Sequence, residues 1–148
     1  MDVTMETVRS LLAPDEPDYE KAKEIGPAAF PFLAGLVESD DKMIASKAAS
    51  LAGMIGGAGA AAVLERAARH PTVAVRAAAA HGAQNLPPAD AERLLIKMMD
   101  DKEPAVSHRA VTAARRVPTE AIRQKLRALQ ADHPAEFVRD AAGKSLSP

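Results

Sequence analysis

Apolar side chains recur at helical spacing in short segments, and turn residues separate these segments. In the stretch 119–131, for example, Ile122, Leu126 and Leu129 follow the i, i+4, i+7 pattern of one helix face. No stretch alternates apolar and polar residues as a strand would. The turn signals between neighbouring segments are Gly56-Gly57, Pro87-Pro88 and Pro118. The chain is therefore predicted to be all-helical, with short helices joined by short turns.

A unit of about thirty residues repeats along the chain, as in helical repeat proteins. Its copies align on one basic residue that small apolar residues follow, and the spacings are 29, 33 and 30 residues. Three copies have Pro five residues earlier, where a helix begins at no loss of a hydrogen bond. We call the aligned basic residues the basic ladder. They are Lys47, Arg76, Arg109 and Arg139.

Each unit pairs a first helix, which carries the ladder residue, with a second helix. One such pair cannot bury its apolar face alone, so neighbouring pairs must stack into a single continuous core. We therefore predict one repeat domain over residues 1–148. Its parts are a cap helix in 1–16, repeats at 17–41, 42–70, 71–102 and 103–132, and a terminal half repeat at 133–148.

Composition supports closely packed helices and narrows the chemistry. Hydrophobic residues make up 47% of the chain but aromatic residues only 3%, because Ala dominates. Ala favours helix and lets helix axes approach closely. The chain has no Cys, which excludes disulfides and thiolate chemistry. It also lacks an N-terminal apolar segment and any long apolar stretch, so we expect a cytoplasmic protein without a membrane segment.

At the ladder positions the chain resembles the short HEAT-like repeats of phycobilin-lyase-type proteins. Val75-Arg76-Ala77-Ala78 and Val138-Arg139-Asp140-Ala141-Ala142 match that pattern best, whereas Ser46-Lys47 and His108-Arg109 depart from its Val-Arg pair. The resemblance covers about residues 17–148. It implies a right-handed α-α superhelix of about four to five helical pairs. It also implies that the second helices line the concave side.

Charge is distributed unevenly, although the net charge is only −1. Residues 1–69 carry 7 basic and 11 acidic side chains, and residues 70–148 carry 12 basic and 9 acidic ones. Arg123 and Arg127 are four residues apart and so share a helix face. A solvated face and a partner-binding surface remain alternative interpretations. The partner-binding candidates on the second helices are Arg66, Arg69, Arg93, Lys97, Arg123, Gln124 and Arg127.

The basic ladder has a structural and a functional interpretation. Its residues could pair with carboxylates in the turns between repeats, or could form a charged stripe for an acidic partner. Recurrence at one position of each repeat favours the structural interpretation, although exposed pairs add little stability. The candidate carboxylates are Asp40, Asp41, Asp100, Asp101 and Asp132.

Neither a cofactor site nor a metal site is expected. The string from Gly57 to Ala62 fits a dinucleotide fingerprint, but a helical segment precedes it where that fingerprint needs a strand. We interpret it as a turn between helices. The four His residues lack metal-ligand spacing. HEAT-like hydroxylases use His-Glu dipeptides, and this chain has none. We therefore do not expect an enzyme.

The leading hypothesis is a scaffold that binds a protein or peptide, an acidic one among the options, on the concave second helices. A nucleic-acid-binding protein resembling HEAT-like DNA glycosylases is one alternative, although the chain lacks Trp and has a single Tyr on which bases could stack. A bilin lyase or chaperone is the other alternative, suggested by the repeat type. The oligomeric state stays open.

Overall fold

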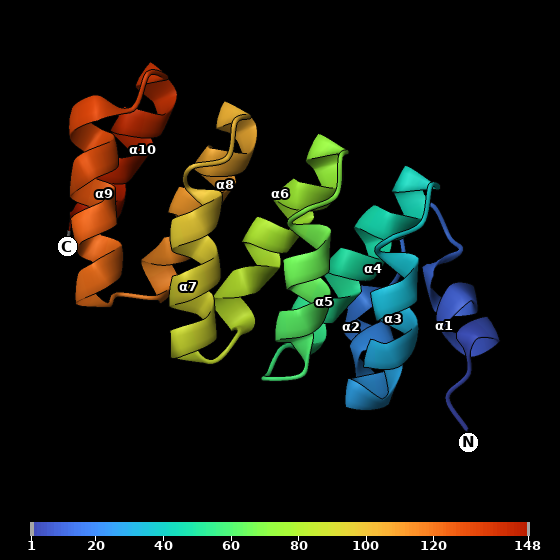
Figure 1. The fold of residues 1–148 in the computed structure, drawn as a ribbon. Helices are drawn as coiled ribbons and strands as arrows, with labels where there is room; N and C mark the ends of the chain where they lie inside the picture. Colours follow the sequence, from blue (N-terminus) through green and yellow to red (C-terminus); the bar gives the residue numbers. More distant parts are fainter. Residues whose placement is uncertain (1, 148) are drawn as a thin grey trace.

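In a computed structural model of the protein, residues 2–147 form helices and the turns between them. Figure 1 shows the helices in two rows, which we call the first-helix row and the second-helix row. The first-helix row is α4 (Lys42–Ile55), α6 (Val73–Gly82), α8 (Pro104–Ala113) and α10 (Glu136–Leu146). The second-helix row is α3 (Phe30–Leu36), α5 (Ala60–Ala67), α7 (Pro88–Met98) and α9 (Glu120–Asp132). The remaining helices are α1 (Met5–Leu12), α2 (Tyr19–Ala22) and the 3-10 helices η1 (Lys23–Ala29), η2 (Ala83–Asn85) and η3 (Ala114–Arg116).

The predicted fold class is confirmed. Helical pairs stack side by side into a solenoid, with α1 at one end and α10 at the other (Figure 1). Apolar side chains from both rows form one continuous core, which includes Leu51, Leu64 and Met99 as fully buried residues. The string that begins at Gly57 starts in the turn between α4 and α5, and its last three residues open α5. Gly56 and Gly57 have φ values of 68° and 80°, the left-handed conformation that Gly adopts most readily.

The turn before each first helix follows one hydrogen-bonding rule. The N-cap residues Asp41, Thr72, Glu103 and Ala135 lie 31, 31 and 32 residues apart. Two residues before each N-cap, a side chain accepts a hydrogen bond from the N-cap backbone N–H at 2.9–3.0 Å. Three kinds of acceptor meet the rule in the four turns, a hydroxyl, a carboxylate and, twice, an imidazole; the residues are Ser39, Asp101, His70 and His133.

A second contact closes the same turn from inside the helix. Arg76 Nη1, Ser107 Oγ and Arg139 Nη1 each donate to the backbone carbonyl six residues earlier, at 3.0, 3.0 and 2.6 Å. These three residues all stand four positions after their N-cap. The repeat register therefore differs from the one used to define the basic ladder. Lys47 and Arg109 lie two positions further along their helices than Arg76 and Arg139 do.

The first helices pack more closely against one another than the second helices do. A Cβ added to Gly53 of α4 would lie 2.6 Å from Cα of Gly82 of α6, so these two backbones are in contact. Between α5 and α7, by contrast, a hollow of about 220 Å³ remains. In a curved stack the more closely spaced row lies on the inner side. We expected the second helices on the concave side, and the packing places the first helices there instead.

Candidate functional site

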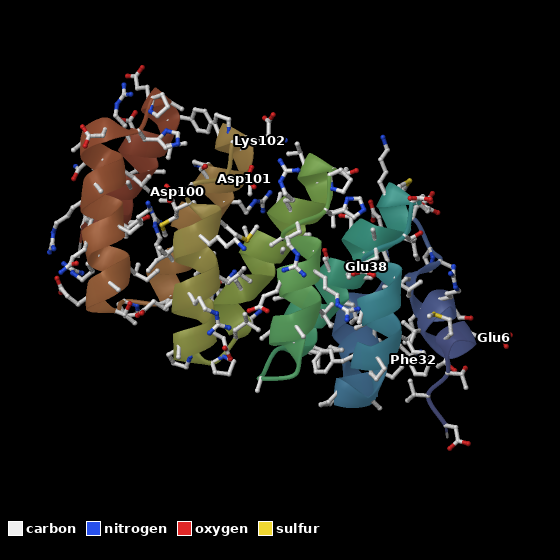
Figure 2. The ribbon with its side chains drawn as sticks, in the orientation of Figure 1. Glu6, Phe32, Glu38, Asp100, Asp101 and Lys102 are labelled. Carbon is white, nitrogen blue, oxygen red and sulfur yellow. The ribbon has the colours of Figure 1, made fainter. Side chains whose placement is uncertain are left out.

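Two of the predicted basic residues of the second-helix row, Arg66 and Arg93, form ion pairs between repeats, and so does Lys125, which was not among the candidates. In three places a cation of one repeat contacts a carboxylate of the preceding repeat. The pairs are Arg66–Glu38 at 3.8 Å, Arg93–Glu65 at 2.9 Å and Lys125–Asp100 at 2.7 Å. Figure 2 labels Glu38 and Asp100, which lie at the ends of α3 and α7. This row therefore mixes both signs of charge and ties its own repeats together, as exposed pairs do at modest gain.

The predicted residues beyond these pairs fall into two groups. Arg69, Arg93 and Lys97 line the hollow between α5 and α7. On α9, Arg127 contacts Glu120 of its own helix at 3.4 Å. The other two candidates on α9, Arg123 and Gln124, do not line that hollow.

Members of the basic ladder have different environments. Arg76 is buried and pairs with Asp101, whose position in the turn between α7 and α8 is labelled in Figure 2. Lys47 donates from Nζ to the backbone carbonyl of Pro14 at 2.7 Å, and Arg139 donates to the carbonyls of its own turn. Arg109 is exposed, and within residues 2–147 no ion pair reaches it. We considered pairing with a carboxylate for all four ladder residues. Within residues 2–147, Arg76 is the one that makes such a pair.

The solvent-facing side of the first-helix row carries a shallow groove over α6. Three residues of α6 that face this side are alanines, so nothing longer than a methyl group rises from its centre. The groove has a volume of about 300 Å³. We call it the alanine groove, and its lining residues are Ser46, Ser50, Ala74, Ala77, Ala78, His81 and Arg109. A second, more apolar hollow of about 270 Å³ adjoins it, lined by Lys42, Met43, Ser46, Lys47 and Ala74.

The helices around this groove carry positive charge alone. No Asp or Glu occurs in residues 42–55, 73–85 or 104–116, which make up α4, α6 with η2, and α8 with η3. The second helices α5, α7 and α9 contain both signs. The basic residues of the three first helices are Lys42, Lys47, Arg76, Arg109, Arg115 and Arg116. The first-helix surface from α4 to α8 is thus uniformly basic, whereas the second-helix row is mixed.

Sequence reasoning missed this surface because it followed charge along the chain. Arg109 and Arg116 belong to a basic stretch that continues into α9. The binding role was nevertheless assigned to the second helices. A separate tally of acidic residues in the first helices would have found the asymmetry.

Electrostatics within the groove centre on His81. Partial burial lowers the pKa of His81, and the positive charges of Arg109 and Arg116 lower it further. The imidazole is thereby favoured in its neutral form. At the far side of the groove, burial raises the pKa of the Tyr19 hydroxyl, and a hydrogen bond with the Ser50 side chain opposes that shift. The groove therefore has a cationic wall on α8 and hydroxyl groups on the α4 side.

Two further observations concern residues 2–147. No three His, Cys, Asp or Glu side chains in this range come together in a way that could hold a metal ion. None of the helices in this part of the chain is long and apolar enough to cross a membrane.

Comparisons with known proteins agree with this architecture. A family model described as HEAT repeats matches residues 67–147. One similar solved structure is the complex of CpcE and CpcF of phycocyanin lyase from Nostoc, with a TM-score of 0.79 and 20% identity over 97% of this chain and 98% of that one. Another is human deoxyhypusine hydroxylase in complex with glycerol, with a TM-score of 0.69 and 20% identity. That match covers 79% of this chain but only 42% of the hydroxylase chain. A comparison with curated proteins finds no match.

Proposed function

The chain belongs to the HEAT-repeat family, and from this premise we propose that it is a non-catalytic scaffold that binds a protein or peptide partner. The observation that carries the proposal is the alanine groove, an open hollow on helices that bear no carboxylate. The second-helix row supports the same division of roles, because three of its cations, Arg66, Arg93 and Lys125, already bind carboxylates of neighbouring repeats. We therefore assign partner binding to the first-helix row.

A non-catalytic role is supported by the side chains that meet in the groove. They are Ala methyl groups, two Ser hydroxyls, one imidazole and one guanidinium. General-base catalysis and nucleophile activation by His depend on a third group, commonly a carboxylate, that orients the imidazole. The helices around His81 carry none. The groove is suited to hold a segment of another molecule and lacks the parts that would activate it.

The test compares the two rows by charge reversal. Cross-linking followed by mass spectrometry identifies the proteins bound to the unmodified chain and to two double variants. We expect Arg109→Glu with Arg116→Glu to abolish specific capture, because Arg109 lines the groove and the charge of Arg116 acts on His81 within it. The matched control, Arg123→Glu with Arg127→Glu on α9, is expected to retain it. Capture lost only in the α9 variant would transfer the binding role to the second-helix row. Capture unchanged in both variants would contradict a partner-binding role for either surface.

A bilin-handling role is the second candidate. It is favoured by the likeness to the phycocyanin lyase complex, which extends over nearly the whole of both chains. That structure is also a complex of two proteins, which is consistent with a protein partner for a chain of this fold. Mixing the protein with a free bilin and recording the absorption spectrum tests this candidate. An unchanged spectrum at saturating protein would remove it.

A further inference from the structure

We propose that the alanine groove binds an extended acidic peptide segment whose carboxylates pair with Arg109 and Arg116. The proposal rests on the scaffold function above and names the chemistry of its partner. Two properties of the first-helix row support it, namely the shape of the groove and the unpaired cations beside it.

The shape of the groove fits a narrow, extended segment. Ala74, Ala77 and Ala78 make a floor of methyl groups on α6, and the longer side chains of α4 and α8 rise on either side. Ser46 and Ala74 also line the adjoining apolar hollow, so the two spaces are continuous. Helices packed about 8–10 Å apart make the path from α4 across α6 to α8 roughly 20 Å long. About six residues of extended chain span that distance.

The cations at the groove's α8 wall lack internal partners. Arg109 lies on α8 and Arg116 ends the following helix η3, and both side chains are exposed. Among the described residues no carboxylate pairs with either of them. Both are close enough to lower the pKa of His81, so their charges act within the groove. Hydrogen bonds between guanidinium and carboxylate are stronger than neutral ones, which makes carboxylates the preferred ligands here.

The groove offers different chemistry along its length. At the α4 end, Met43 is 59% exposed and borders the apolar hollow with Ala74. At the other end, α10 carries Glu136 and Asp140 together with Arg139 and Lys144, so this helix has no excess of cations for an acidic segment. The partner segment is therefore expected to place an apolar side chain near Met43 and its carboxylates near α8. It is not expected to extend over α10.

Nucleic acid fits the same surface less well. Single-stranded nucleic acid binds to stacking platforms of aromatic rings, and the floor of this groove consists of methyl groups. Affinity for duplex DNA grows with the number of phosphates neutralised, and the cations beside the groove and its adjoining hollow are few, namely Arg109, Arg116, Lys42 and Lys47. A peptide can also place an apolar side chain against Met43 and Ala74, whereas a phosphate backbone has no group for that contact.

Backbone amide NMR tests the proposal, because the 15.5 kDa chain gives resolvable spectra and weak binding is still detected by residue. One probe is a peptide of about eight residues that carries Leu near one end and Glu near the other. The second is the same peptide with every Glu replaced by Gln, and the third is a short duplex DNA. We expect the Glu peptide to shift amides of α6 and α8 around Ala77 and Arg109. The Gln peptide is expected to shift them at least about tenfold more weakly, which corresponds to about 1.4 kcal/mol.

Variants identify the residues responsible. Arg109→Gln with Arg116→Gln is expected to weaken binding of the Glu peptide about tenfold or more, while Arg123→Gln with Arg127→Gln leaves it within about twofold. Equal binding of the Glu and Gln peptides, or shifts centred on the second-helix row, would overturn the proposal. Tighter binding of DNA than of the Glu peptide through the same amides would overturn it in favour of nucleic acid.

The two proposals fail in distinguishable ways. If no peptide binds but capture of a protein is still lost with Arg109→Glu and Arg116→Glu, the scaffold function stands and the acidic peptide is rejected. If capture is insensitive to charge reversal on both rows, the scaffold function fails and the acidic peptide proposal fails with it.

Discussion

Arg76 and Asp101 form a buried, two-point ion pair that joins one repeat to the next. Nε of Arg76 lies 2.9 Å from Oδ2 of Asp101, and Nη2 lies 3.2 Å from Oδ1. Their side chains are only 7% and 11% exposed. The same guanidinium donates to the carbonyls of His70 and Pro71, and Asp101 accepts the backbone N–H of Glu103. One side chain thus connects α6, the turn before it and the turn before α8.

Replacing Arg76 with Ala is expected to destabilise the protein strongly. The substitution leaves the carboxylate of Asp101 buried without its cation, a loss that costs about 3–5 kcal/mol. Urea unfolding followed by circular dichroism measures it. Arg139→Ala is the matched control, because Arg139 makes the same two carbonyl contacts but no ion pair. A loss of equal size in both variants would show that the carbonyl contacts, and not the ion pair, carry the energy.

Gly53→Ala is expected to destabilise the protein by at least about 1–3 kcal/mol, the usual cost of overpacking. Its added Cβ would lie 2.6 Å from Cα of Gly82, and a backbone atom cannot rotate away. Gly35→Ala is the control, since its Cβ would meet only the end of the Met5 side chain at 3.8 Å. Because Ala favours helix over Gly, Gly35→Ala is expected to stabilise by up to about 1 kcal/mol. Thermal unfolding of both variants gives the comparison, and equal effects would refute the close approach of α4 and α6.

His133→Ala is expected to cost about 1 kcal/mol, as the loss of a helix-capping acceptor does. Nδ1 of His133 accepts the backbone N–H of Ala135 at 3.0 Å. His133→Asn is expected to recover most of the stability, because its amide oxygen can accept the same hydrogen bond. Urea midpoints of the three proteins test this prediction. If Asn is no better than Ala, the imidazole contributes through packing instead of through the hydrogen bond.

Stability is expected to fall as pH drops below about 6.5, the ordinary pKa of His. The pKa of His81 is lowered in the folded protein by partial burial and by Arg109 and Arg116. Below the ordinary value the unfolded chain therefore binds a proton at His81 more readily than the folded protein does. Above it both forms are neutral, and the contribution of His81 is fully present. His81→Gln is expected to lose less stability between about pH 7.5 and pH 5, measured by urea midpoints, and an unchanged slope would contradict the cause.

Much of the fold could be predicted from the sequence because its signals are local. Pro71, Pro104 and Pro134 precede or open first helices, and Gly56-Gly57 forms the predicted turn. The register of the first helices could not be obtained the same way. The alignment followed Arg109, but the residue that closes the turn in that repeat is Ser107. In different repeats a Ser hydroxyl and an Arg guanidinium donate to the equivalent backbone carbonyl. An alignment by residue type does not match Ser with Arg.

The candidate surface could not be predicted from the sequence, because it depends on how the helices pack in three dimensions. Which row faces inward depends on how closely helices approach, and Gly53 and Gly82 meet although they lie in different repeats. The pairing of Arg93 with Glu65 likewise joins residues of successive repeats. The sequence shows the cations of the second helices, but it does not show which carboxylates form ion pairs with them.

Backbone contact between Gly53 and Gly82 also has a mechanical consequence. With no side chain between them, α4 and α6 cannot slide or rotate relative to each other without a clash, so they form a stiff pair. Deformation of the solenoid is therefore expected to concentrate beyond α6, where side chains separate the helices. The α4 and α6 sides of the alanine groove are therefore expected to keep a fixed spacing, so that a bound segment meets them without rearrangement.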